Sequence, residues 1–303
     1  MNLKKIKLEI FYLKKSFFQY KKGFQYLNNK FFLAPKILAG KKVLSKPINN
    51  TELSIHILTC HRDLVMLIWS LASFYYFSKV IGQLYIHSDG SLTPDDKKLI
   101  SQFFLDAIFI EPSDILEKNS QGLNAHPVIK QFRIEHQNDL FTKKIIDSFF
   151  VSDKKFHLLF DSDILWFKDS QAIFDQLNLS LPKSLMIGGN GGGNYVYFKD
   201  GTKLSDDLAN FNAGVIFYSK DNFDLNRLAE FLTKFDTAQK RNFYFLEQAG
   251  HAYCLNNLNA WSKDKYFIHQ TVDQNTIAKH YTSPRRPLFY IEGIEILKDK
   301  ILS

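Results

Sequence analysis

The chain has 303 residues, 45% of them hydrophobic, which is enough to bury a sizeable core as one large domain or two coupled ones. It contains no run of the roughly 20 apolar residues that a membrane-spanning helix needs. The net charge of +8 comes from the start of the chain, because residues 1–50 hold 12 lysines and one acid, whereas the rest holds 27 basic and 30 acidic residues. A nucleic-acid-binding protein needs a basic face on its folded domain, so no nucleic-acid partner is expected.

The location of the protein is indicated by its first residues and its cysteines. Lysines recur through the first 22 residues and interrupt the apolar run that a signal peptide requires. Cys60 and Cys254 lack the spacing of a metal site and are expected to be buried, reduced thiols. We therefore expect a cytoplasmic protein.

The N-terminal segment has apolar residues at alternating steps of three and four from Leu3 to Phe31, with lysines beside them. This pattern predicts one amphipathic helix. Three interpretations remain open: packing against the protein's own domain, a coiled coil, or a helix lying on an anionic membrane through residues 1–32, peripheral to its inner face. With a linker that follows Pro35, the sequence divides into a basic helical segment at 1–50 and a main domain at 51–303.

After residue 50, predicted strands alternate with predicted helices. Strands are expected at 53–60, 83–87, 107–110 and 156–160, and helices at 64–77, from Thr93 onward and at 139–150. This order predicts an α/β fold whose mostly parallel sheet is covered by helices, with ligands beyond the carboxyl ends of the strands. A glycine- and asparagine-rich run at 188–194 predicts either an acceptor-side loop or a flexible connection.

The most informative motif is the acidic pair Asp161 and Asp163, which directly follows a predicted strand and has apolar residues on both sides. Two carboxylates at this spacing repel each other, and burying them is costly without a cation. A divalent metal with oxygen ligands resolves this conflict, especially together with phosphate oxygens. A capping or turn role is the alternative.

Four blocks resemble, in order, those of the glycogenin and lipopolysaccharide-galactosyltransferase family, which are retaining glycosyltransferases of the GT-A fold. The blocks are Leu-Phe-Asp-Ser-Asp-Ile-Leu at 159–165, Phe-Asn-Ala-Gly-Val at 211–215, Glu-Gln at 247–248 and His-Tyr-Thr-Ser-Pro-Arg-Arg-Pro at 280–287. The resemblance extends from about residue 53 to 290 and implies a Rossmann-like mixed, mostly parallel sheet flanked by helices. The chain departs from the family pattern at Glu247, Ser283, Arg286 and Leu288, where aspartate, glycine, lysine and tryptophan are usual.

The resemblance implies a metal site and a reactive centre. Asp161, Asp163 and His280 would hold Mn²⁺ or Mg²⁺, and the imidazole favours Mn²⁺. Gln248 is the candidate residue on the reactive face of the sugar, with Glu247 as its companion. Asn212 would act with them at the sugar.

The resemblance also implies a donor-binding set around the metal site. Arg286 would pair with the diphosphate, and Asn212 and Gly214 would line the sugar pocket. The acidic pair and Ser162 between its members belong to the same set. Lys143 stands where the family has an arginine that buttresses the donor, and the nucleotide base would lie near Thr59 and Asp63.

The resemblance implies metal-dependent transfer of a sugar from a nucleotide-diphosphate donor to a glycan or glycolipid acceptor. The donor would be a UDP-sugar, as is usual in the family, and the transfer would retain the anomeric configuration. Three alternatives remain open. One is a different GT-A enzyme, either inverting or a nucleotidyl-sugar synthase. Another is a degenerate relative that serves as a membrane-surface binding or scaffold protein without catalysis. The third is a Mg²⁺-dependent phosphatase of the haloacid-dehalogenase type, whose aspartate pair is expected at its first strand, whereas Asp161 comes late.

Overall fold

The computed structural model describes residues 3–40, 42–117, 120–188 and 196–303, and these form a mixed α/β fold. In the described residues, the central sheet has seven strands in the order β3 (Ile108–Ile110), β2 (Gln83–Ser88), β1 (Leu53–Thr59), β4 (Phe156–Phe160), β7 (Asn212–Ser219), β6 (Ser184–Ile187) and β8 (Leu258–Ala260). Only β7 runs antiparallel to its neighbours in this sheet. The predicted α/β class with a mostly parallel sheet is therefore confirmed.

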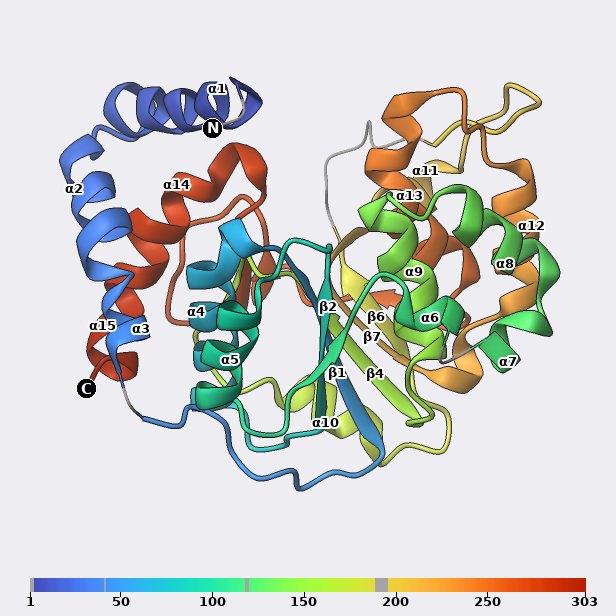
Figure 1. The fold of residues 1–303 in the computed structure, drawn as a ribbon, viewed down its shortest axis with the longest axis horizontal. Helices are drawn as coiled ribbons and strands as arrows, with labels where there is room; N and C mark the ends of the chain where they lie inside the picture. Colours follow the sequence, from blue (N-terminus) through green and yellow to red (C-terminus); the bar gives the residue numbers. More distant parts are fainter. Residues whose placement is uncertain (1–2, 41, 118–119, 189–195) are drawn as a thin grey trace.

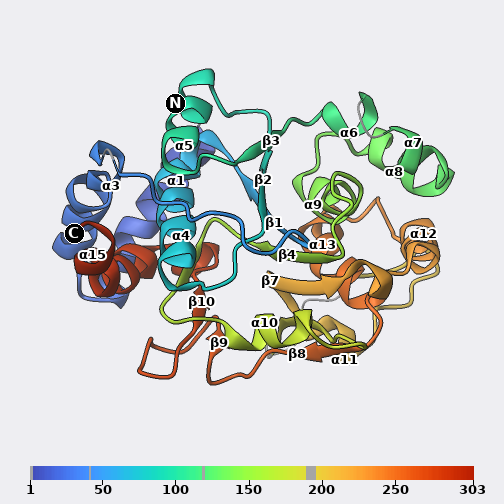
Figure 2. The same cartoon turned by 90° about the horizontal axis from the view of Figure 1, so that it is seen from below.

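Helices cover both faces of this sheet, as Figures 1 and 2 show. On one side lie α4 (Leu64–Phe77) and α5 (Pro94–Phe103), and on the other lie α9 (Leu140–Phe150) and α13 (Lys240–Cys254). Side chains alternate along β4, so that Leu158 and Phe160 join one hydrophobic core and Leu159 joins the other. Between the two terminal segments, the described residues also form α6 (Asp114–Glu117), α7 (Ser120–Asn124), α8 (Pro127–Glu135), α10 (Gln171–Leu177), α11 (Asp206–Ala209) and α12 (Leu225–Lys234).

Local sequence signals placed several elements correctly. The helix predicted at 64–77 and the strand predicted at 156–160 have these bounds in the structure. Thr93 caps α5 by accepting a hydrogen bond from the backbone N–H of Asp96, whose carboxylate accepts one from the Thr93 N–H in return. Both cysteines are free, as expected, but only Cys254 is buried, whereas Cys60 is partly exposed. The glycine-rich run at 188–194 lies, apart from Gly188, outside the described residues.

A small second sheet joins the C-terminal part of the chain to the end of the central sheet. It contains β5 (Ile164–Trp166), β10 (Ala278–His280) and β9 (Tyr266–Phe267), with β10 between the other two. β10 pairs antiparallel with β5, placing His280 opposite Ile164. Because β5 follows the acidic pair after only a short turn, this pairing carries residue 280 to the carboxyl end of β4.

The N-terminal segment differs from the single helix predicted by the apolar pattern. It is divided into α1 (Leu3–Lys14), α2 (Gly23–Asn28) and α3 (Lys36–Ala39), with π-type turns at Lys15–Gln19 and Asn29–Leu33. Lys21 lies between the first two helices with a positive φ of 53°, which ends the regular helix. The interruptions change which side faces the domain: Tyr12 and Tyr26 are buried, whereas Phe24 of the predicted stripe is 81% exposed.

The N-terminal segment and the C-terminal helices lie side by side, as the blue and red ribbons show in Figure 1. The C-terminal elements are α14 (Arg286–Leu288), a π-type turn at Phe289–Ile294 and α15 (Glu295–Ile301). Asn29 donates a hydrogen bond to the backbone oxygen of Tyr290, 2.9 Å away. Among the described residues, no helix has both the length and the apolar character needed to cross a membrane.

Four buried histidines lie on the face of the sheet that packs against α9 and α13. His87, His56 and His157 come from the neighbouring strands β2, β1 and β4, and His251 comes from α13. His56 stacks on His157 with ring centroids 5.1 Å apart and shares a hydrogen bond of 3.0 Å with His87. Burial lowers the pKa of His87, His157 and His251 to about 3, so these rings are neutral at pH 7.

Candidate active site

A cleft of about 380 Å³ lies beyond the carboxyl ends of β1 and β4. This position is where ligands bind in open α/β sheets. With the exception of Lys143, all the residues predicted from the sequence line it: Thr59, Asp63, Asp161, Ser162, Asp163, Asn212, Gly214, Glu247, Gln248, His280 and Arg286. The fold thus brings together side chains that are up to 227 residues apart in the sequence.

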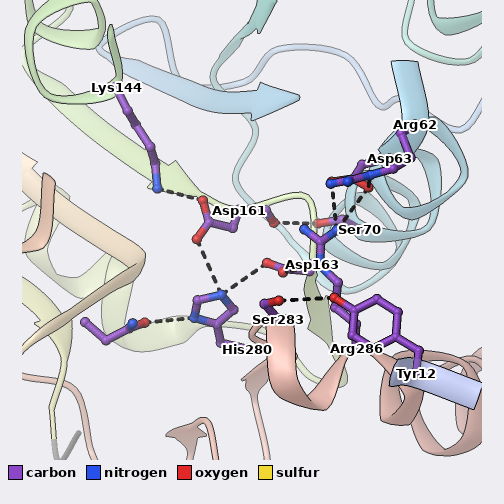
Figure 3. A network of polar contacts seen from close by, with 11 residues as sticks. Tyr12, Arg62, Asp63, Ser70, Lys144, Asp161, Asp163, His280, Ser283 and Arg286 are labelled. Atoms are coloured by element: carbon purple, nitrogen blue, oxygen red, sulfur yellow. Dashed lines mark hydrogen bonds and ion pairs between the residues drawn. The ribbon is translucent and has the colours of Figure 1, made fainter. Parts of the chain in front are cut away.

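Asp161, Asp163 and His280 form a group that could hold a metal ion, with one ligand atom from each within 4.8 Å of the others. His280 Nε2 lies 3.1 Å from Asp163 Oδ1 and 3.4 Å from Asp161 Oδ2, as seen in Figure 3. The backbone fixes this arrangement, because Tyr281 N–H donates to the Asp163 carbonyl and Asp161 N–H donates to the Gly214 carbonyl.

Asn212 determines which nitrogen of His280 faces the carboxylates. Its Oδ1 accepts a hydrogen bond from the backbone N–H of Gly214 at 2.9 Å and lies 2.8 Å from His280 Nδ1. An oxygen in this position requires a proton on Nδ1, so the neutral ring presents the lone pair of Nε2 to the acidic pair. This tautomer suits a metal ligand, because histidine ligands generally donate their second N–H to a neighbouring acceptor.

Gly214 leaves the space that His280 occupies. A Cβ at this position would lie 2.3 Å from His280 Nδ1 and 2.8 Å from Asn212 Oδ1, closer than van der Waals contact allows. From the sequence, Gly214 was assigned to the lining of the sugar pocket, where a ligand would be its neighbour. In the structure, the close neighbour is the histidine itself.

Lys144 is the cation at the base of the cleft, and sequence reasoning chose the adjacent Lys143 instead. Lys144 Nζ lies 2.7 Å from Asp161 Oδ1, donates to the Ala213 carbonyl and forms an ion pair with Glu247. Burial alone would lower the pKa of Lys144, but the two carboxylates outweigh it and raise the pKa. Lys143 instead directs its Nζ toward the backbone oxygen of Asp89 at 3.5 Å. Neither lysine lines the cleft itself, and Lys144 acts on it through Asp161 and Glu247.

The two residues predicted for the reactive face, Glu247 and Gln248, both come from α13. Glu247 is buried, and burial raises its pKa, although the charge of Lys144 opposes this shift. Gln248 is only partly buried and lines the cleft. Glu247 therefore belongs to the charged base of the site, whereas Gln248 is accessible from the cleft.

Arg286 bridges two carboxylates on the opposite side of the acidic pair. Its Nε lies 3.1 Å from Asp163 Oδ2, and a terminal nitrogen lies 3.0 Å from Asp63 Oδ1. Burial alone would raise the pKa of Asp163, but His280 and Arg286 hold it well below its usual range. Asp163 is therefore ionised, and the acidic pair has cationic side chains on both sides, Lys144 on Asp161 and Arg286 on Asp163 (Figure 3).

The N-terminal segment forms part of the cleft wall, which the sequence did not predict. Leu8 and Tyr12 of α1 line the cleft, and the Tyr12 hydroxyl forms a hydrogen bond of 3.1 Å with Ser283 Oγ. Figure 3 shows Tyr12 beside the turn that carries Ser283 and Arg286. Thr59 lines another wall, and its buried Oγ1 has no hydrogen-bond partner among the described residues.

Comparison with solved structures identifies the fold. The bifunctional glycosyltransferase WbbM has a TM-score of 0.52 and 11% identity, with 84% of this chain and 52% of that chain covered. This chain has the GT-A fold. Mouse xyloside xylosyltransferase 1 has a TM-score of 0.48 and 10% identity, covering 78% of this chain and 98% of that one. The galactosyltransferase LgtC has a TM-score of 0.46 and 12% identity, with 76% of this chain and 87% of that chain covered.

No protein-family model and no curated protein matches the sequence. The assignment to the GT-A fold therefore comes from the structure. The donor set fits a divalent metal, since two carboxylates and one imidazole of the correct tautomer converge at the cleft.

Proposed function

We propose that this protein is a metal-dependent glycosyltransferase that moves a sugar from a nucleotide-diphosphate donor, a UDP-sugar, to a glycan or glycolipid acceptor. One observation carries the proposal: Asp161, Asp163 and His280 converge on one point of a cleft at the carboxyl ends of the strands of a GT-A fold. The cationic Arg286 lies directly beside this group. Such a site suits an anionic diphosphate held jointly by a dication and an arginine.

The chemical demand of the reaction is stabilisation of the leaving group. As the anomeric C–O bond breaks, negative charge develops on the diphosphate, and a bound dication supplies a Lewis acid for that charge. Asp161, Asp163 and His280 would hold the ion, with Mn²⁺ favoured by the imidazole ligand. Arg286 would bind the same diphosphate through its guanidinium, adding a fixed positive charge at the point where charge accumulates.

The remaining cleft residues would position the two substrates. Asn212 and Gly214 border the sugar side together with Gln248, and Thr59 and Asp63 border the side expected to receive the nucleotide. We propose retention of anomeric configuration on the basis of the sequence resemblance, with Gln248 on the reactive face. A cytoplasmic location and peripheral contact with a membrane belong to the same proposal, as does the division of the chain near residue 50.

The proposal is tested by thermal shift with a panel of nucleotide sugars, with and without Mn²⁺. A specific donor at 100-fold over its Kd should stabilise the protein by roughly 2.7 kcal/mol, and only when Mn²⁺ is present. Hydrolysis of the same donor should then be measured for the wild type, Asp161→Asn and Asp163→Asn. We expect both variants to remain folded and to lose Mn²⁺-dependent turnover by roughly 10²-fold or more.

Three results would contradict this assignment. Near-normal turnover by either variant would remove the acidic pair from the reaction. Donor binding without any hydrolysis or transfer would favour the non-catalytic scaffold, and release of phosphate from simple phosphomonoesters would favour the phosphatase.

A further inference from the structure

The exposed phenylalanines of this protein are concentrated in one segment. Among the described residues, those exposed by more than a third of their surface all lie between residues 11 and 32. They are Phe11, Phe17, Phe18, Phe24, Phe31 and Phe32. The chain has 29 phenylalanines in total, so this gathering is a property of the segment and not of a phenylalanine-rich surface in general. Exposed aromatic rings concentrated in one segment mark it as a binding region.

Charge on the same segment indicates what kind of surface would cover these rings. Lys7, Lys14, Lys21 and Lys22 are exposed, and the one acid of the segment, Glu9, already pairs with Lys30. The rings and the lysines together form a surface that is both apolar and strongly basic. An anionic lipid bilayer matches both properties, because rings enter the boundary of the acyl chains while lysines contact the headgroups.

The opposite side of the segment is fixed to the catalytic domain. Tyr12 and Tyr26 belong to the same hydrophobic core as α4 and the central sheet. Lys15 donates a hydrogen bond of 2.8 Å to the carbonyl of Pro284, two residues before Arg286, and Tyr12 contacts Ser283 in the same turn. The segment is therefore packed firmly on the domain. Some of its residues form part of the cleft wall, while its exposed phenylalanines face the solvent.

We propose that residues 6–40 dock the protein on an anionic lipid surface through the exposed phenylalanines and lysines, and so hold the cleft beside the bilayer. A lipid-linked sugar would then be the acceptor, because docking brings the cleft wall formed by Leu8 and Tyr12 to the surface where such an acceptor lies. The acceptor class rests on the proposed function, whereas the docking does not. The contact between Tyr12 and Ser283 would hold the turn carrying Arg286 against the donor.

Docking is tested with the full-length protein and vesicles, without any nucleotide. Co-sedimentation with vesicles containing phosphatidylglycerol should be strong, and with phosphatidylcholine vesicles weak. The variant Phe18→Ser/Phe32→Ser should bind anionic vesicles at least roughly tenfold more weakly, because it removes two of the rings that enter the bilayer. The matched control is Leu105→Ser/Leu181→Ser, whose side chains are 63% and 83% exposed on other parts of the surface. This control should bind vesicles as the wild type does.

Charge is tested separately by Lys14→Gln/Lys21→Gln/Lys22→Gln, which should weaken binding to anionic vesicles roughly fivefold for each lysine in contact with the surface. Donor hydrolysis in solution should be unchanged in the phenylalanine and lysine variants, since these residues do not line the cleft. Tyr12→Phe should have the opposite pattern. Its binding to anionic vesicles should equal that of the wild type, whereas its Kd for the donor should rise roughly twofold to tenfold because one hydrogen bond is lost.

Wild-type vesicle binding by the phenylalanine variant would overturn the docking proposal. So would equal binding of the wild type to neutral and anionic vesicles, or a concentration-dependent dimer that forms through these rings in place of vesicle binding. Failure of docking with intact Mn²⁺-dependent donor binding would refute this inference alone. Vesicle binding without donor binding would instead refute the proposed function and, with it, the acceptor class.

Discussion

Replacing Asn212 by alanine tests the view that this side chain sets the tautomer of His280. The Asn212 Oδ1 accepts from the Gly214 N–H and from His280 Nδ1, at 2.9 and 2.8 Å. Without it, the buried Nδ1–H of His280 loses its acceptor, and the ring is free to change tautomer or orientation. Loss of such an outer hydrogen bond typically lowers metal affinity 10- to 100-fold. This corresponds to about 1.4–2.7 kcal/mol of binding free energy at 25 °C.

The assay is calorimetric titration of the protein with Mn²⁺ in the absence of donor. Asn212→Ala should raise the Kd for Mn²⁺ by the stated factor, whereas Asn212→Asp, which keeps an acceptor oxygen, should retain most of the affinity. Asn210→Ala is the matched control, because Asn210 precedes the same strand but does not line the cleft. Wild-type Mn²⁺ affinity in Asn212→Ala would refute the reasoning, and so would equal losses in the alanine and aspartate variants.

Three further predictions concern the interior of the protein. Lys144→Met should lower the free energy of unfolding by about 3–5 kcal/mol in urea titrations, because it leaves Asp161 and Glu247 without their buried cation. The control, Lys143→Met, should lower the free energy of unfolding clearly less. Gly214→Ala should weaken Mn²⁺ binding by roughly tenfold or more, since the new Cβ displaces His280, and unchanged affinity would disprove the close packing. Lowering the pH from 7.5 to 5.5 should reduce the free energy of unfolding, with about 4 kcal/mol of the loss coming from His87, His157 and His251, because these buried histidines with a pKa of about 3 stay neutral in the folded state while the unfolded chain binds protons below pH 6.5. His157→Phe should diminish the loss by about 1.4 kcal/mol, and identical pH profiles for both proteins would contradict it.

The parts of the fold that sequence could predict are those specified by neighbouring residues. Thr93 and Pro94 mark the start of α5 through side-chain and backbone preferences that act within one turn. The acidic pair was recognisable because a buried apolar strand runs directly into it. The pairing of His280 with this motif was anticipated only through the family resemblance, since the contact depends on β10 reaching β5 across more than a hundred residues.

The choice between Lys143 and Lys144 could not be made from the sequence. Adjacent residues of a helix point in directions about 100° apart, so one of the two must face away from the acidic pair. However, α9 is buried from Thr142 to Phe149, and no polar face remains to reveal its orientation. Only the packed structure shows that Lys144 faces Asp161.

The N-terminal segment was misjudged for a different physical reason. The apolar stripe was drawn through Ile10, Phe17 and Phe24 because a continuous helix would align them. The π-type turn and the positive φ of Lys21 shift the register, and the buried positions are taken by Tyr12 and Tyr26 instead. Both tyrosine hydroxyls have polar partners, Ser283 of the domain for Tyr12 and Lys30 of the same segment for Tyr26, which a count of apolar residues ignores.

The pairing of β5 with β10 has a consequence for biosynthesis. During translation both aspartates leave the ribosome together with β5, more than a hundred residues before His280 and Arg286. Until then the growing chain presents only the pair of carboxylates. The group of three forms only after β10 has been translated and has paired with β5, so its assembly depends on the docking of this later part of the chain.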